Sequence, residues 1–263
     1  MDKLAILIGI DDYPFLGDLD SSENDIGLIS NALRAYWRFS NDEILTLSSS
    51  GRGRTRASIW TLEAAFKEAT RRRKLANLVV AFRGRANPGW QTPRRLCFPD
   101  TDLGNERNVK ATSLPLRDFF CKIAEIHAVN TTILLDYRPT LPPNAPLLFD
   151  AIENSLIQED VDSADVLRDA IAPNAKAGVL YACSPGESPF DKDGNSLFAA
   201  AFSSGVRDSA NAFSGSLDQL AGRIALEVGA NAKKIGEKQL PLFKYYGIED
   251  IRFSFTRRDP AKD

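Results

Sequence analysis

Short apolar runs alternate with longer segments of helical periodicity along the chain, and this alternation most constrains its fold. Strands are predicted over residues 4–10, 43–47, 76–82, 131–137, 177–183 and 250–255, and helices over 24–39, 57–74, 114–128, 196–207 and 217–230. The first run, LAILIGI, is apolar on both faces, as expected of a strand buried inside a parallel sheet. The pattern therefore predicts an α/β fold in which helices cover a largely parallel sheet.

Length and composition allow a large core. The chain has 263 residues, of which 43% are hydrophobic, enough for one large α/β domain or two small ones. Segment 138–176 is proline-rich and then acidic, and we interpret it as an excursion rather than a boundary, so one domain over 1–263 is predicted. The formal charge of −2 argues against a chain-wide attraction to nucleic acid or an anionic membrane.

The cysteines predict a reducing compartment. Cys97, Cys121 and Cys183 form an odd set whose spacing matches no metal-binding pattern, so no metal site is predicted and free thiols are expected. The apolar run near the N-terminus is too short for a signal peptide or a spanning helix. We therefore expect a cytoplasmic protein.

In an open parallel sheet, ligands bind beyond the carboxyl ends of the strands. Those ends fall here at residues 11–13, 83–87, 136–138 and 183–185. The only histidine, His127, precedes the predicted strand 131–137 and would lie about 20 Å from that edge. A Cys-His or Ser-His dyad at the carboxyl edge is therefore not expected, since general-base activation needs hydrogen-bond contact. His127 is interpreted as a residue at a helix C-terminus.

Two basic stretches stand apart from the strand ends. GRGRTRAS contains Arg52, Arg54 and Arg56, and TRRRK contains Arg71, Arg72, Arg73 and Lys74. Neither stretch interleaves aromatic residues with its cations, so base stacking is not indicated. We interpret both as solvated basic surface, with partner docking as a second possibility and nucleic-acid or nucleotide binding as an alternative function.

Several segments, in this order, resemble the caspase and metacaspase family of cysteine peptidases. LAILIGIDDYPFLGDLDSSENDIGLISNAL is similar to the opening strand and helix, LVVAFRGRANPG to the strand before the family's SGHG loop, and TTILLDYRPT to the strand ending in DSCHSG or QACRGT. RLCFPDTD, GVLYACSPGESPFDKDGNSLFAAAF and KQLPLFKYYG resemble the hairpin, the small-subunit segment and a late Gln-x-Pro segment before the final strand.

The resemblance implies a caspase-like three-layer sandwich. Its sheet would have six strands in the order 2-1-3-4-5-6, with the last antiparallel. A large-subunit-like part would cover 1–137, a linker 138–176, a small-subunit-like part 177–256 and a polar tail 257–263. Homodimers could form through the last strand, as an analogy to the family.

The chain departs from the family at the positions of the family's catalytic residues. Arg85 stands where the family has its base histidine, and the nucleophile position holds Arg138 or Tyr137, depending on the alignment. An arginine stays protonated at neutral pH and cannot act as the base. The resemblance thus implies a caspase-like pseudoprotease acting as a scaffold, regulator or protein-binding module in a signalling, stress or defence assembly.

The resemblance also marks a former substrate pocket at Asp25, Asp136, Cys183 and Ser184. We expect Arg85 and Arg138 to pair with Asp25 and Asp136 and so fill this pocket from within. The alternative is a divergent endopeptidase that uses a relocated thiol.

No cofactor is predicted. Calcium enters only by family analogy, because Asp100 and Asp102 lack the ligand spacing of a recognised calcium loop.

Overall fold

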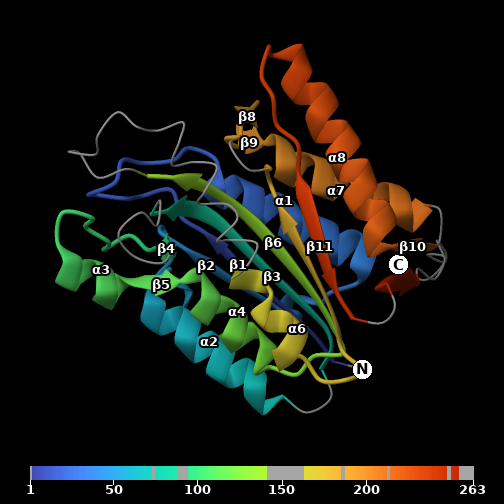
Figure 1. Cartoon of the computed structure of the whole chain (residues 1–263), viewed down its shortest axis with the longest axis horizontal. Helices are drawn as coiled ribbons and strands as arrows, with labels where there is room; N and C mark the ends of the chain where they lie inside the picture. The colour runs from blue at the N-terminus through green and yellow to red at the C-terminus, as the bar shows by residue number, and fades with distance from the viewer. Residues whose placement is uncertain are drawn as a thin grey trace.

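The computed structural model describes residues 2–72, 75–87, 94–140, 163–184, 187–211, 214–247 and 250–254. Its central sheet runs in the order β11-β7-β6-β3-β1-β2 (Figure 1). These strands are β1 (Asp2–Gly9), β2 (Ile44–Ser48), β3 (Leu75–Ala86), β6 (Asn130–Pro139), β7 (Lys176–Tyr181) and β11 (Leu242–Tyr246). Only β11 is antiparallel to its neighbour, so the predicted strand order and the antiparallel last strand are confirmed.

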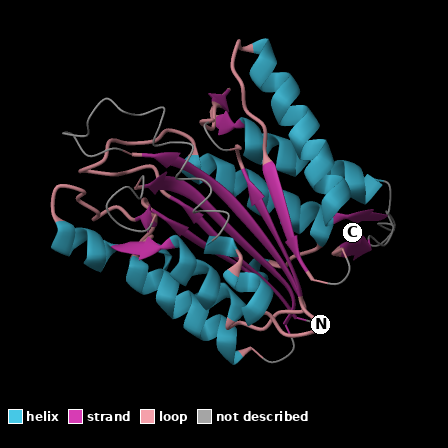
Figure 2. Cartoon of the chain, in the orientation of Figure 1, coloured by secondary structure: helices cyan, strands magenta, loops and turns pink. Residues whose placement is uncertain are grey.

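Helices cover both faces of the sheet, which makes three layers (Figure 2). One face carries α2 (Ile59–Arg71), α4 (Leu116–Ala124) and α6 (Val166–Ala170), and the other carries α1 (Ser22–Trp37), α7 (Leu197–Asn211) and α8 (Leu217–Lys234). Each face has its own hydrophobic cluster, because alternate strand residues point to opposite sides. Phe82 of β3 belongs to the first cluster and its neighbour Ala81 to the second.

The predicted sixth strand is wrong in position. The segment predicted as strand 250–255 contributes β12 (Arg252–Ser254), which pairs with β10 (Ser214–Ser216) in a separate two-stranded sheet. The sixth place in the main sheet belongs to β11, within the segment interpreted as preceding the last strand.

Gln239 explains this placement. Its amide donates to the carbonyl of Ala182 at 2.8 Å and accepts from the Phe190 amide at 2.9 Å, which ties the chain to the carboxyl end of β7. The following residues therefore run antiparallel along β7, and the chain reaches the opposite sheet edge before residue 252.

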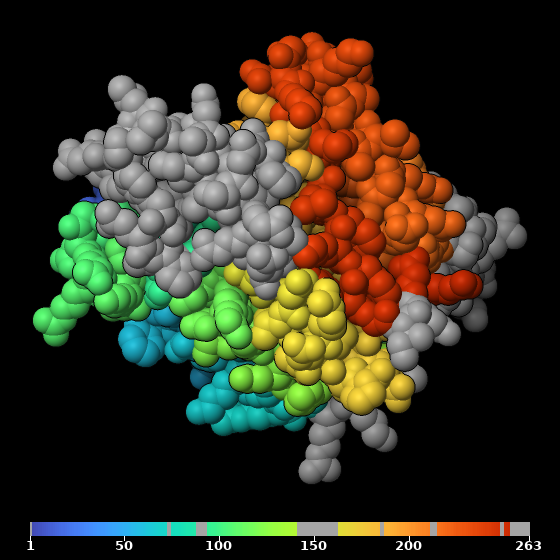
Figure 3. Space-filling view, in the orientation of Figure 1, coloured from blue at the N-terminus to red at the C-terminus, as the bar shows by residue number. Residues whose placement is uncertain are grey.

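Smaller elements complete the fold. An antiparallel pair, β4 (Arg95–Cys97) and β5 (Ser113–Pro115), lies beyond β3 and encloses α3 (Glu106–Thr112), as the predicted hairpin suggested. Figure 3 shows the segment of α6, in yellow, against β11, in red. Asp165 joins them by accepting from Lys244 at 3.2 Å and from the Tyr246 hydroxyl at 3.1 Å.

Candidate functional site

The candidate site lies where β3 and β6 end, at the carboxyl edge predicted to hold it. The two strands are parallel and in register, so Arg83 lies opposite Asp136, and Arg85 lies opposite Arg138. Paired positions of this kind project to the same face. Two arginines therefore meet where the family resemblance placed a histidine and a cysteine.

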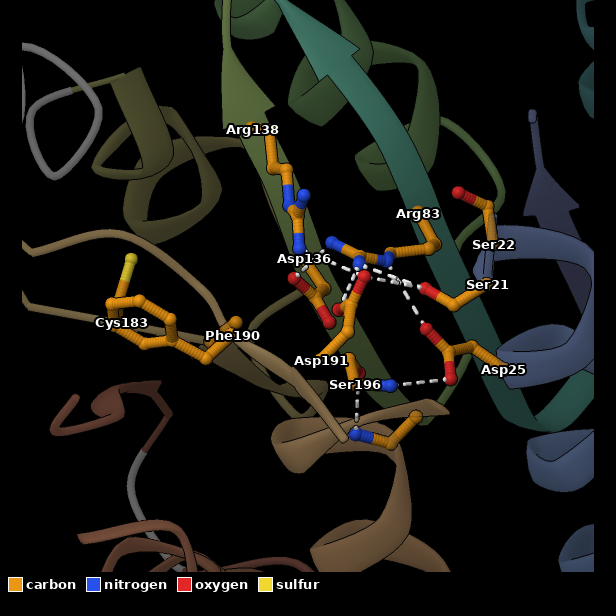
Figure 4. Close-up of polar contacts among 12 residues, drawn as sticks. Ser21, Ser22, Asp25, Arg83, Asp136, Arg138, Cys183, Phe190, Asp191 and Ser196 are labelled. Atoms are coloured by element: carbon orange, nitrogen blue, oxygen red, sulfur yellow. Dashed lines mark hydrogen bonds and ion pairs between the residues drawn. The ribbon is translucent and has the colours of Figure 1, made fainter. Parts of the chain in front are cut away.

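Arg83, rather than Arg85, occupies the acidic pocket (Figure 4). Its side chain is 2% exposed, and each guanidinium nitrogen has an acceptor. Nε donates to Asp25 at 3.1 Å, Nη1 to Asp136 at 2.9 Å, and Nη2 to Asp191 at 2.6 Å and to the Ser21 hydroxyl at 3.1 Å. We call Arg83, Asp25, Asp136 and Asp191 the Arg83 cluster. The planar fork of an arginine suits such multiple carboxylate pairing, which a lysine could not reproduce.

Helix α1 positions Asp25. Asp11, just after β1, accepts from the backbone amides of Ser22 and Glu23 at 2.7 and 3.0 Å and so caps the start of the helix. Asp25 lies in the first turn, where an acidic side chain is favoured. Its other carboxylate oxygen accepts from the Ser196 amide at 2.8 Å.

A two-residue hairpin positions Asp191. Strands β8 (Asp191–Lys192) and β9 (Asn195–Ser196) are joined by Asp193 and Gly194, both at positive φ, as an Asp-Gly hairpin turn requires. The hairpin pairs Asp191 with Ser196, so it brings both to the Arg83 cluster. The β8–β9 hairpin thus closes the pocket from the side opposite α1.

Burial and repulsion between acids raise the pKa values of Asp25 and Asp136. Burial, together with the nearby charge of Asp136, raises the pKa of Asp25 to about 7, while Arg83 acts against both. Burial also raises the pKa of Asp136, again opposed by Arg83. For Arg83, burial favours the neutral form, but the three carboxylates more than offset this and its pKa is raised. The guanidinium is thus the charge that allows Asp25 and Asp136 to share a buried site.

The prediction that Arg85 pairs with Asp25 or Asp136 is wrong. Arg85 donates to the carbonyl of Gly17 at 2.6 Å, the carbonyl of Asp18 at 3.1 Å and the Thr140 hydroxyl at 3.1 Å. Its own backbone amide donates to the Tyr13 hydroxyl at 2.9 Å. Two positions beyond Arg83 on the same strand face, Arg85 reaches the loop after β1 rather than the acids, and it holds that loop in place.

Arg138 pairs with Asp191, an acid outside the predicted pocket. Its Nη2 lies 2.8 Å from Asp191, on the side of that carboxylate away from Arg83. The expected pairing with Asp25 or Asp136 is therefore replaced by a bridge through the hairpin. Burial lowers the pKa of Arg85. The charge of Arg138 lowers it too, as expected for two cations at paired positions on adjacent strands.

Tyr137 faces the other side of the sheet. It belongs to the core of the α2 side, and its hydroxyl accepts from Arg94 Nη1 at 3.1 Å. Of the two candidate nucleophile positions, Arg138 therefore shares a face with Arg85, whereas Tyr137 does not.

The remaining pocket candidates lie outside the Arg83 cluster. The Cys183 thiol contacts the Glu187 carbonyl at 3.1 Å, and the Ser184 hydroxyl donates to the Leu240 carbonyl at 2.7 Å. Cys97 is buried, and burial raises its pKa to about 12. His127 follows α4 at the amino end of β6, as predicted.

Only some residues of the two basic stretches lie close together in the structure. Arg54, Arg71 and Arg72 line one groove between β2 and α2, with a volume of about 760 Å³, which also contains Asp42 and Glu68.

The other basic residues are separate from that groove. Arg52 begins the short 3-10 turn Gly53–Thr55, and Arg56 pairs with Asp100 at 3.8 Å. The predicted docking residues Arg73 and Lys74 lie outside the described residues.

Calcium ligation by Asp100 or Asp102 stays a prediction from family analogy. Asp102 accepts from the Gly104 amide at 2.9 Å, a local turn contact. Among the residues described, no group of three His, Cys, Asp or Glu side chains is arranged to hold a metal. Within the same part of the chain, no helix is both long and apolar enough to cross a membrane.

Sequence reasoning missed Arg83 and Asp191. Arg83 ends an apolar run two residues before Arg85, and that spacing puts both on one strand face. The Asp-Gly pair in DKDGNS is a strong hairpin signal that could have marked Asp191. Neither signal indicates which arginine would reach the acids.

The family model for the caspase domain matches residues 2–246. The chain belongs to the caspase family. The sequence resemblance is confirmed at this level, and the match extends over the strands and loops that build the Arg83 cluster.

Solved structures share the caspase fold of this chain at low sequence identity. Caspase-1 from Spodoptera frugiperda matches with a TM-score of 0.60 and 11% identity, covering 97% of this chain and 92% of that chain. The pro-sf-caspase-1 structure matches with a TM-score of 0.60 and 10% identity, covering 96% and 94%. Protein GSU0716 from Geobacter sulfurreducens matches with a TM-score of 0.57 and 13% identity, covering 95% of each chain. No curated protein sequence matches the chain.

Proposed function

We propose that this chain is a catalytically inactive caspase-like protein whose acidic pocket is occupied by its own Arg83. It acts as a scaffold, regulator or protein-binding module in a signalling, stress or defence assembly. The observation that carries the proposal is the buried guanidinium of Arg83 bonded to Asp25, Asp136 and Asp191. A basic side chain of a substrate would have to displace it from three carboxylates.

The residues at the carboxyl edge support the loss of peptidase chemistry. Arg85 and Arg138 are permanent cations and can serve neither as general base nor as nucleophile. His127, the only histidine of the chain, lies at the opposite edge of the sheet. The burial that raises the pKa of Cys97 to about 12 keeps that thiol protonated at neutral pH.

A peptidase assay tests the inactive state. The full chain is incubated with peptides that carry Arg, Lys or Asp before the scissile bond, with and without calcium. We expect no turnover above buffer. Turnover that disappears in Cys183→Ala or Cys97→Ala would establish the alternative, a divergent peptidase with a relocated thiol.

Partner binding is tested separately. A pull-down with the intact chain should retain a specific protein partner, which a reciprocal pull-down should confirm. By family analogy two copies could also meet along the edge strand β11, and sedimentation would detect that dimer. A chain that stays monomeric and retains no partner would contradict the proposed binding role.

One observation favours polyanion binding as a second candidate function. Arg54, Arg71 and Arg72, from two distant stretches, line the same groove. Binding to single-stranded nucleic acid should then weaken steeply with salt. Neutralising these three arginines should abolish it.

A further inference from the structure

A separate pocket opens at the amino edge of the sheet, opposite the edge that holds the Arg83 cluster. Its walls come from the C-terminal end of α1, the first residues of β3 and β6, and Arg252 of β12. Its volume is about 390 Å³. This lies at the lower end of the range of about 300–1,000 Å³ that small-molecule sites occupy.

The charge of this pocket is one-sided. Lys3, Arg38 and Arg252 line it, whereas no Asp or Glu is found among its described lining residues. Arg38 and Arg252 are exposed residues of this lining. The groove between β2 and α2, in contrast, mixes cations with two acids. The pocket therefore favours an anion.

Lys3 removes the main electrostatic obstacle to an anion. The C-terminus of α1 would repel negative charge, because its last carbonyls carry the negative end of the helix dipole. Lys3 Nζ donates to the carbonyls of Trp37 and Arg38 at 2.7 and 3.2 Å, and lies 5.4 Å from the centre of the Phe39 ring. With that helix end neutralised, the charges of Arg38 and Arg252 act on the pocket unopposed by it.

Aromatic rings form another wall. Tyr36 and Trp37, both half-buried at the end of α1, are among the residues that line the pocket. Trp37 packs edge-on against Phe202 with ring centres 5.9 Å apart, which holds its indole in place. A fixed aromatic surface of this kind suits stacking by a planar base.

Polar groups line the strand side of the pocket. Asn130 Nδ2 donates to Asn77 Oδ1 at 3.2 Å across the starts of β6 and β3. Each asparagine amide carries both donors and an acceptor, so the pair has capacity left for the edge of a base. Cations, an aromatic wall and paired amides together fit a ligand with a phosphate and a heterocycle.

We propose that this pocket binds a nucleoside monophosphate, with its phosphate at Arg38 and Arg252 and its base against Trp37. The site is independent of the Arg83 cluster. It also differs from the basic stretches, because none of their residues lines it.

Calorimetric titration of the full chain with AMP, GMP and UMP tests the proposal, with adenosine and inorganic phosphate as partial ligands. We expect saturable binding of at least one nucleotide, and at least tenfold weaker binding of adenosine and of phosphate. Fluorescence quenching by the bound nucleotide should disappear in Trp37→Phe.

Matched variants locate the site. The double variant Arg38→Gln with Arg252→Gln should bind the nucleotide at least tenfold more weakly, because it loses the charge-assisted hydrogen bonds to the phosphate. Arg223→Gln, an exposed arginine of α8 outside the pocket, should bind like the wild type. The proposal is overturned if no nucleotide binds, if adenosine or phosphate binds as tightly as the nucleotide, or if the double variant binds unchanged. Loss of binding in Arg223→Gln would also overturn it.

Discussion

Nη1 of Arg83 lies 2.9 Å from Oδ1 of Asp136, across register-paired positions at the ends of β3 and β6. Both side chains are almost fully buried. The sheet therefore sets this contact directly, because the two residues are neighbours on adjacent parallel strands. Asp25 and Asp191 then complete the cluster from α1 and from the β8–β9 hairpin.

Removing the charge of Arg83 should strongly destabilise the fold. Arg83→Met keeps a similar length but leaves the buried carboxylates of Asp25 and Asp136 without their cation, and breaking such a buried pair costs about 3–5 kcal/mol. Urea unfolding measures the loss. Arg207→Met, which removes an exposed arginine, is the control and should change the free energy of unfolding by less than about 0.5 kcal/mol. A cost below about 1 kcal/mol for Arg83→Met would contradict this account.

Chemical rescue offers a second test of the same pocket. Arg83→Ala should leave a space shaped for a guanidinium, so millimolar methylguanidinium should raise the Tm of this variant, since a ligand that binds only the folded state stabilises it. Wild type and Arg207→Ala should show no such rise. Equal effects of methylguanidinium on all three proteins would mean that the pocket does not recognise the ligand.

Stability should fall as pH rises because of Asp25. The folded state raises its pKa from 3.8 to about 7, so between these values the folded chain holds a proton that the unfolded chain has lost. The contribution of this proton is complete below about pH 4 and is lost as pH rises through 7. The stability of the wild type relative to Asp25→Asn should therefore decrease from pH 4 to pH 8 in urea titrations. A difference that stays constant, or that grows with pH, would contradict the raised pKa.

Thiol chemistry can test whether the side chains at positions 85 and 138 lie next to each other on β3 and β6. Arg138→Cys places a thiol on the face of the sheet that Arg85 occupies, and adding Arg85→His supplies a base at the paired position. Iodoacetamide should alkylate the introduced thiol faster in the double variant than in Arg138→Cys with Arg85→Gln, because a neighbouring histidine favours the thiolate. Equal rates would indicate that the two positions do not face each other.

Gly84 should not tolerate a side chain while Tyr13 is present. A Cβ at Gly84 would overlap the Tyr13 hydroxyl, which accepts from the Arg85 amide and donates to the Cys97 carbonyl. Gly84→Ala should cost about 1–3 kcal/mol in thermal or urea unfolding, as overpacking does. Because Tyr13→Phe removes the overlapping atom, the double variant should cost less than the sum of the two single variants. Additive costs would argue against this contact.

The α/β class could be predicted because it depends on local and repeated features, whereas the strand order followed from the family resemblance. Runs such as 4–10 and 76–82 are apolar on both faces, and the segments between them have helical periodicity, so a parallel sheet with helices on both sides follows. The last strand was misplaced because 242–246 and 250–255 both read as strands locally. The contact of Gln239 with Ala182, far away in sequence, decides between them.

The sheet edge that holds the candidate site was predicted, but the side chains that pair with each other there were not. Asp25 and Asp136 follow from the family resemblance, and the carboxyl edge follows from the parallel sheet. Arg85 and Arg83 share a strand face, so spacing alone gives no preference for either. The choice depends on which arginine lies within reach of Asp25 in the first turn of α1, the helix whose start Asp11 caps.

By itself, the sequence determined the α/β class and the edge at which a site lies, and the family resemblance added the strand order and the expectation of arginine at the family's histidine position. These depend on periodicity and residue identity, which are local. Only the tertiary structure decided that Arg83 fills the acidic pocket, that Asp191 joins it from a hairpin and that Arg138 bridges to Asp191. The physical reason is that a buried charge pairs with whichever opposite charges the packing of distant segments brings within hydrogen-bond distance.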